Sequence, residues 1–319
     1  MDRETNRIEE GINLYSVKDF SDWSIYEGFS EGGGRSEKQW LQSPNGEVGL
    51  FKWPKIDPQT GSQTYEFLSE HLAYRIGNIL GIPTAKVDIG VYDSRIGSIS
   101  YLVNGKNEEL REGAWFILGK HPNYDVDNLY DPDTREYYSI KHIFEVIEKE
   151  EIQYYWMKMM FFDFLIGNRD RHQNNWAYLL PIEDKGKNII RVRPCPLYDN
   201  GSSLCCYINE DRLDEYLGKD RNRLNALVDT KSRSAIRIDP SIKKGPKHSD
   251  VVKYLFEKYP KSKMIADNMI EKMTEPNIKE LINEYPDTLI SQKRKQLLGV
   301  FLKEKVNLLT RLRNEVYGE

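Results

Sequence analysis

A short polar stretch at residues 167–176 contains the residue types that phosphoryl transfer requires. It carries Asp170 and, five positions later, Asn175, after an apolar run and before a predicted strand. In phosphoryl transfer a carboxylate orients and deprotonates the attacking hydroxyl, and oxygen ligands hold Mg²⁺ beside the phosphates. One tight loop with this spacing can supply both. The alternative is a loop stabilised by an Asx turn, because Asp and Asn are common in turns.

A second carboxylate follows at the end of the next strand-like run, over residues 189–196. Asp199 stands there, directly before Asn200 and Gly201. A carboxylate at the end of a strand is where a second metal ligand is expected in a phosphoryl-transfer site. The alternative is an Asp-Asn-Gly turn with no chemical role.

Lys52 lies within an apolar strand predicted over residues 48–53. Burying its ammonium group is costly without a partner, and at this position the group can reach the α and β phosphates of a nucleotide. Glu66, which opens the following helix, is the expected partner, and Glu70, one turn later on the same face, is the alternative. The remaining alternative is that Lys52 extends to solvent from an edge strand.

Upstream of this lysine, residues 31–38 contain a run of glycines. Glycines allow backbone N–H groups to approach phosphate oxygens closely. The run lacks the Gly-Lys-Ser/Thr ending of a P-loop, and the alternative is a flexible turn. The order of glycine loop, lysine, helix glutamate, Asp-x4-Asn loop and second Asp is that of a kinase. The expected nucleotide contacts are Gly32, Gly33, Gly34, Arg35, Ser36, Lys52, Glu66 and Tyr101.

The elements that position these residues divide into two predicted lobes. Residues 1–104 form a small β-rich lobe, with the nucleotide loop, the lysine strand, a helix that ends near Gly81 and two further strands. Residues 105–319 form a larger helical lobe, with the catalytic loop and the metal site. The predicted fold class is therefore α+β, with two lobes around a nucleotide-binding cleft. Its further elements are a polar loop at 119–138, a helical pattern at 139–165, a hairpin at 176–192 and helices over 249–317.

Composition narrows the class of protein. The chain has 319 residues, 39% apolar and 30% charged, which excludes a disordered chain. A net charge of −4 argues against nucleic-acid binding as the main function. Cys195, Cys205 and Cys206 lack metal-ligand spacing and are expected to be reduced thiols. Without a predicted signal peptide or transmembrane segment, a cytoplasmic protein is expected, with export by a non-classical route left open.

Some features leave other functions open. The basic, irregular segment at residues 218–248 is expected to be a solvated activation-type segment. The alternative is that it receives an anionic acceptor or a membrane. A small-molecule or lipid-headgroup kinase would use the same parts, and an inactive nucleotide-binding module would bind ATP without turnover.

Taken together, the motifs resemble the kinase domain of HipA-like serine/threonine kinases, over about residues 25–300. The resemblance implies a two-lobed kinase fold and Mg-ATP-dependent phosphorylation of protein Ser or Thr. It implies that Asp170 is the catalytic base, that Asn175 and Asp199 bind the metal, and that Lys52 and the 32–38 loop contact ATP. The matching segments are residues 34–38, 51–52, 66–73, 81–83, 167–176 and 198–199.

The resemblance also bears on regulation and partners. In the family a serine of the glycine loop can be autophosphorylated, which switches the enzyme off, and Ser36 and Ser30 are the candidates here. Toxin members carry a further N-terminal subdomain and pair with an antitoxin. Because the loop of this chain begins near residue 30, we do not expect an antitoxin partner. The expected partner is a protein substrate that no motif identifies.

Overall fold

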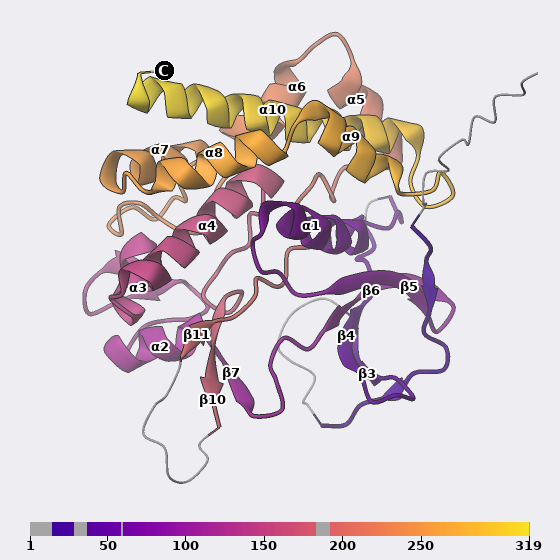
Figure 1. Cartoon of the computed structure of the whole chain (residues 1–319), viewed down its shortest axis with the longest axis horizontal. Helices are drawn as coiled ribbons and strands as arrows, with labels where there is room; N and C mark the ends of the chain where they lie inside the picture. The colour runs from indigo at the N-terminus through magenta and orange to yellow at the C-terminus, as the bar shows by residue number, and fades with distance from the viewer. Residues whose placement is uncertain (1–14, 29–36, 59, 183–191, 319) are drawn as a thin grey trace, which may run out of the picture.

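The computed structural model describes residues 15–28, 37–58, 60–182 and 192–318. Figure 1 shows a β-sheet part that contains β3 to β6, helix α1 beside it, and a stack of helices that contains α4 and α7 to α10. This arrangement confirms the predicted α+β fold with a β-rich N-terminal part and a helical C-terminal part. Several predicted site residues lie outside the described residues, and their roles stay predictions: Ser30, Gly32, Gly33, Gly34, Arg35 and Ser36.

The N-terminal part is built on a six-stranded sheet in the order β1-β5-β6-β4-β3-β2. In it β1 is parallel to β5, and the other neighbours are antiparallel. Asp93 and Ser94, with φ of 49° and 58°, form the two-residue turn between β5 and β6, a conformation that suits the twist of a hairpin. The strands are β1 (Lys18–Asp19), β2 (Ser24–Ile25), β3 (Lys38–Gln42), β4 (Val48–Lys52), β5 (Val87–Tyr92) and β6 (Arg95–Tyr101).

Helix α1 (Glu66–Leu80) follows β4 in the chain and lies between the sheet and the helical part. Its buried residues include Leu68, Leu72 and Ile76, whose spacing places them on one face. The helix packs against β5 and β6 and also contacts α8. It ends at Gly81, which adopts the left-handed conformation typical of a helix C-terminus. The predicted helix is therefore confirmed, together with its glycine stop.

A short connection leads to the C-terminal part. It runs from the end of β6 at Tyr101 to the start of β7 at Glu108. A second sheet, in the order β11-β10-β7, leads into helices that pack around α4. Its strands are β7 (Glu108–Glu112), β10 (Ala177–Pro181) and β11 (Arg193–Pro194). The larger helices are α2 (Gly113–Lys120), α3 (Ile140–Val146), α4 (Glu150–Ile166), α7 (His248–Lys258), α8 (Ser262–Lys272), α9 (Glu275–Asn283) and α10 (Gln292–Tyr317). The remaining short elements are β8 (Tyr130–Asp131), β9 (Glu136–Tyr137), η1 (Glu210–Arg212), α5 (Leu213–Leu217), α6 (Asn222–Asn225) and the π-helix η2 (Ala226–Thr230).

Two predicted elements differ in the structure. The helical pattern over 139–165 forms two helices, α3 and α4, because the backbone at Ile147 is extended. The polar loop predicted at 119–138 contains the hairpin β8–β9, in which buried Asp131 lies 2.7 Å from the His121 ring nitrogen. The charged residues of this loop did not indicate strands, and β9 also contacts a distant segment, because the Tyr137 N–H donates to the Pro240 carbonyl at 2.7 Å.

The main hydrophobic core surrounds α4, whose residues from Trp156 onward are almost all buried. This confirms the prediction of a buried helix in the most apolar stretch. Each of the three cysteines is buried and has a free thiol. Throughout the part of the chain that the structure describes, no helix is long and apolar enough to span a membrane.

Candidate active site

The loop between α4 and β10 carries the predicted base. Helix α4 ends at Gly167, whose φ of 69° is in the left-handed region and whose Cα faces the Phe301 ring. A Cβ at this position would approach that ring to 3.0 Å, so glycine suits both the turn and the packing. The chain then turns, and the Asn168 side-chain oxygen accepts a 3.1 Å hydrogen bond from the Asp170 N–H.

The helical core holds this loop through a buried polar chain. His248, at the start of α7, lies 2.8 Å from the Asn168 carbonyl through Nε2 and 3.0 Å from the Ser232 hydroxyl through Nδ1. Lys305 of α10 donates to the same hydroxyl at 2.9 Å. Burial lowers the pKa of His248 to about 3, so its imidazole is neutral and donates through one nitrogen. The backbone before the candidate base is thereby anchored.

Arg171 joins the two segments that carry the candidate metal ligands. Its Nη1 donates to the carbonyls of Asn175 and Tyr198, each at 2.7 Å. Its Nη2 donates to the Asn200 side chain at 2.6 Å and to buried Asp163 at 2.8 Å. Arg171 is 1% exposed and Asp163 is 2% exposed, so the pair is an interior one. Arg171 therefore links the Asn175 and Tyr198 backbone to the buried Asp163 carboxylate.

The sequence did contain a signal for this pair. Asp163 is a lone carboxylate in the apolar end of α4, and such a group must be paired when buried. Its partner, eight residues away, lies beyond the end of the helix, where helical spacing no longer identifies neighbours.

Asp170 and Asn175 lie together as their spacing predicted. The Asn175 side-chain nitrogen donates to the Asp170 carbonyl at 2.7 Å. The Asp170 side chain is 57% exposed and faces a cleft of about 780 Å³. Partial burial raises the pKa of Asp170; His172 opposes this rise and the charge of Asp199 adds to it. A reachable carboxylate with a raised pKa is suited to accept a proton from a bound hydroxyl.

Lys52 and Asp199 form a direct contact between the two lobes. Their side chains meet at 2.7 Å, and the Glu70 carboxylate lies 3.5 Å from the same ammonium. Strand β4 lies between β3 and β6, so the alternative of Lys52 on an edge strand is wrong. Burial opposes ionisation of Asp199, but Lys52 outweighs it and lowers the pKa of Asp199 to about 2. The φ of Asp199 is 55°, an uncommon conformation that clusters at functional sites.

The expected pairing of Glu66 with Lys52 is wrong, and Glu70, the predicted alternative, takes that place. Glu66 opens α1 and instead bonds Lys55 at 2.9 Å and the Thr64 hydroxyl at 2.8 Å. Glu70, one turn further along, is buried and also accepts the Asn200 N–H at 2.9 Å. The helix start is too close to the turn after β4 for Glu66 to face the centre of the sheet.

Replacing Glu70 with glutamine is expected to lower kcat/KM for ATP by about tenfold, because a charge-assisted contact to Lys52 is lost. Glu66→Gln is the matched control, and a smaller effect is expected because Glu66 does not contact Lys52. Steady-state kinetics with varied ATP would measure both. An equal loss in the two variants would contradict the assignment.

The structure places the Tyr101 side chain away from Lys52, and its expected nucleotide contact stays a prediction. Tyr101 lies on the same sheet face as Ile99 and Phe51, opposite to the face of Lys52. Its hydroxyl donates to Asp88 at 2.8 Å. The alternation of side chains along a strand places the two residues on opposite faces.

The donor set fits a magnesium ion. Within the described ranges, no group of three His, Cys, Asp or Glu side chains converges to hold a metal. The available donors are the Asp199 carboxylate and the Asn175 side-chain oxygen, since the Asn175 nitrogen is already bonded. Mg²⁺ is commonly bound by one or two protein side chains together with substrate phosphates. These two residues therefore match a site that is completed by a nucleotide.

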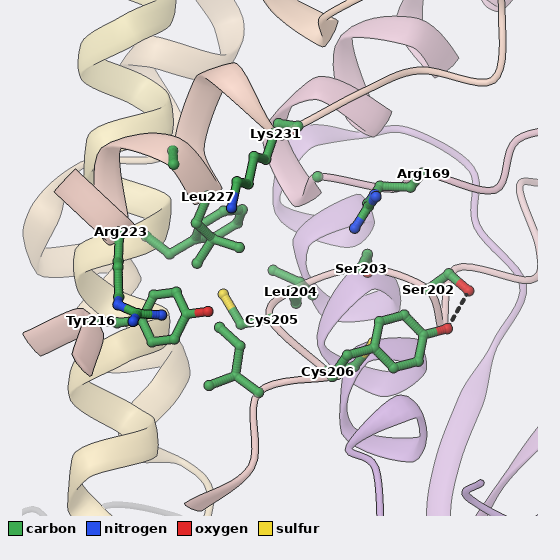
Figure 2. A pocket seen from close by; sticks show the side chains of 16 residues that line it. Arg169, Ser202, Ser203, Leu204, Cys205, Cys206, Tyr216, Arg223, Leu227 and Lys231 are labelled. Carbon is green, nitrogen blue, oxygen red and sulfur yellow. Dashed lines mark hydrogen bonds between the residues drawn. The ribbon is translucent and has the colours of Figure 1, made fainter. Parts of the chain in front are cut away.

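Arg169 lies between two cavities. The larger, of about 780 Å³, contains Asp170 and is the candidate acceptor cleft. The smaller, of about 240 Å³, lies behind the catalytic loop and is walled by the segment at 202–208 and by α6 and η2. Figure 2 shows the side chains of Arg169, Lys231 and Cys205 around this smaller cavity.

Comparisons with known proteins give a consistent result. No family model matches the chain. It is 25% identical over 269 residues to the serine/threonine-protein kinase CtkA of Helicobacter pylori, covering 80% of this chain and 79% of that protein. The crystal structure of the proinflammatory kinase CtkA superposes with a TM-score of 0.76 at 20% identity, covering 94% of this chain and 100% of that one.

A more distant structure has the same fold. HipA of Shewanella oneidensis, solved with HipB and operator DNA, matches with a TM-score of 0.52 at 16% identity, over 99% of this chain and 70% of that one. The sequence similarity to CtkA and the fold shared with both proteins agree with the motif resemblance. The chain is thus similar to HipA-like serine/threonine kinases.

Proposed function

We propose that this protein is a Mg-ATP-dependent kinase that phosphorylates serine or threonine hydroxyls of proteins. The observation that supports this most strongly is the contact of Lys52 with Asp199, two residues 147 positions apart. Through Arg171, the Asp199 segment is also tied to the loop of Asp170 and Asn175. A lysine, a base and two oxygen donors, held together by these contacts, are the parts that phosphoryl transfer needs.

In the proposed reaction the acceptor hydroxyl oxygen attacks the γ-phosphorus of ATP. The proton of that hydroxyl passes to the Asp170 carboxylate, the bond from the γ-phosphorus to the bridging oxygen breaks, and ADP leaves. Lys52 would donate its remaining N–H to the phosphates while Asp199 and Glu70 hold it in place. Mg²⁺ held by Asn175 and Asp199 would neutralise charge on the phosphates.

A protein acceptor is supported by the similarity to CtkA, which is named a serine/threonine-protein kinase. We also propose that the chain phosphorylates itself, at Ser36 or Ser30. Intact-mass analysis followed by peptide mapping, after incubation with Mg-ATP, would place any such phosphate.

Lys52→Met is expected to reduce transfer of labelled γ-phosphate to protein by at least about tenfold, since a charge-assisted hydrogen bond to the phosphates is lost. Lys86→Met is the matched control, because Lys86 is exposed and lies over the Tyr101 ring on the other side of the sheet. Transfer would be measured with Mg-ATP and a lysate of protein acceptors. If the wild type labels no protein, the proposed function is wrong.

A further inference from the structure

The acceptor cleft contains positive charge that the proposed reaction does not use. Arg233 and Arg237, from the basic 218–248 segment, line the same cleft as Asp170. Arg169 borders it from the catalytic loop, and Lys55 lies at its edge. Lys55 is already neutralised by Glu66 at 2.9 Å. The unassigned positive charge is therefore that of the three arginines.

Backbone carbonyls hold two of these guanidinium groups in place. Arg233 donates through Nη1 to the Gly245 carbonyl at 2.8 Å. Arg237 donates through Nη1 to the Ala235 carbonyl at 2.7 Å and through Nη2 to the Lys243 carbonyl at 2.9 Å. These contacts orient the groups without neutralising them.

Other arginines of the same segment are neutralised. Arg221 pairs with Glu304 at 3.3 Å, and Arg223 pairs with Glu215 at 2.8 Å. Counting only residues whose structure is described, neither Arg233 nor Arg237 has such a carboxylate partner. Burial lowers the pKa of Arg237, with only tyrosines opposing the shift. In this segment the arginines away from the cleft are therefore paired with carboxylates, whereas the charges of the two arginines at the cleft are not neutralised.

An oriented guanidinium with no counter-ion is suited to bind a carboxylate or phosphate through two parallel hydrogen bonds. The acidic groups that line the cleft are Asp127 and Asp170. In the proposed reaction Asp170 accepts the proton of the acceptor hydroxyl. Val126 and Leu129 supply apolar wall, which suits a polypeptide segment.

We infer that the acceptor is an acidic protein segment, whose Asp or Glu side chains near the phosphorylated hydroxyl bind Arg233 and Arg237. This inference rests on the proposed function and specifies its substrate class. It also selects between the two roles left open for the basic segment, in favour of an anionic acceptor. An anionic lipid headgroup is the competing ligand, and the experiment includes it.

The test uses serine peptides of equal length that differ only in flanking residues, which are Asp, Ala or Lys. KM and kcat are measured for each with Mg-ATP, and direct binding is measured by fluorescence anisotropy of labelled peptides. The Asp peptide is expected to have a KM about tenfold below that of the Ala peptide. Arg233→Gln and Arg237→Gln should each remove most of this advantage with little change in kcat. Arg221→Gln, outside the cleft, is the matched control.

The outcomes are distinguishable. Equal KM values for the three peptides, or a preference for the Lys peptide, would overturn the inference while leaving the kinase function in place. If the wild type labels no protein in a lysate while the Asp peptide still binds in an Arg233-dependent way, the proposed function is wrong, and only the binding of an acidic segment stands. Phosphorylation of phosphoinositide micelles in place of the peptides would overturn both. Loss of the Asp preference at high salt would support the ionic contact.

Discussion

Asp170→Asn is expected to reduce phosphoryl transfer by about 10²–10⁴-fold, because asparagine cannot accept the proton of the acceptor hydroxyl. The substitution keeps the size of the side chain, and the contacts of the Asp170 backbone to Asn168 and Asn175 do not depend on the carboxylate. ATP binding should therefore change little while kcat falls. Initial rates of γ-phosphate transfer and ATP affinity by calorimetry would measure the two effects.

Asp22→Asn is a matched control for this experiment, since Asp22 is an exposed residue of the N-terminal part, remote in sequence from the loop. It should retain the wild-type rate. If Asp170→Asn transfers phosphate at a rate within tenfold of the wild type, Asp170 is not the base. The raised pKa of its carboxyl would then not indicate a catalytic role.

Arg171→Met is expected to lower the free energy of unfolding by about 3–5 kcal/mol, because it leaves the Asp163 carboxylate buried without its partner. The carbonyls of Asn175 and Tyr198 lose a donor at the same time. Loss of these contacts should also separate the two candidate metal ligands and reduce activity. Urea denaturation followed by tryptophan fluorescence would measure the stability.

Arg169→Met is the matched control for stability, because Arg169 is exposed and its replacement should change the free energy of unfolding by no more than about 0.5 kcal/mol. The double variant Asp163→Leu with Arg171→Met should recover part of the loss, since no charge stays buried without a partner. An Arg171→Met protein as stable as the Arg169→Met protein would contradict the role of Arg171.

Elements with a local origin could be predicted from the sequence. Strand β4, helix α1 with its glycine stop and the β5–β6 hairpin follow from the periodicity of apolar residues and from turn residues. Buried α4 follows from its apolar composition. The candidate residues Asp170, Asn175 and Asp199 were identified by residue type, by spacing and by their positions at the ends of predicted elements. Each of these signals acts over a few residues.

Elements that depend on distant contacts could not be predicted in the same way. The hairpin β8–β9 contacts a distant segment through the Tyr137 N–H and the Pro240 carbonyl, and the break between α3 and α4 had no proline or glycine signal. Whether Glu66 or Glu70 pairs with Lys52 depends on how α1 is placed against the sheet. The sheet face of the Tyr101 side chain relative to Lys52 depends on the pairing register of β6 with β4, which is not a local feature.

The sequence by itself determined which residue types were available for phosphoryl transfer and in which order they occur along the chain. Only the tertiary structure decided that Lys52 meets Asp199, that Arg171 joins the segments of Asn175 and Asp199, and that Arg233 reaches the cleft of Asp170. The physical reason is distance along the chain. Local propensity and periodicity describe neighbours within a few residues, whereas these contacts depend on packing between the sheet, α1 and the helical core.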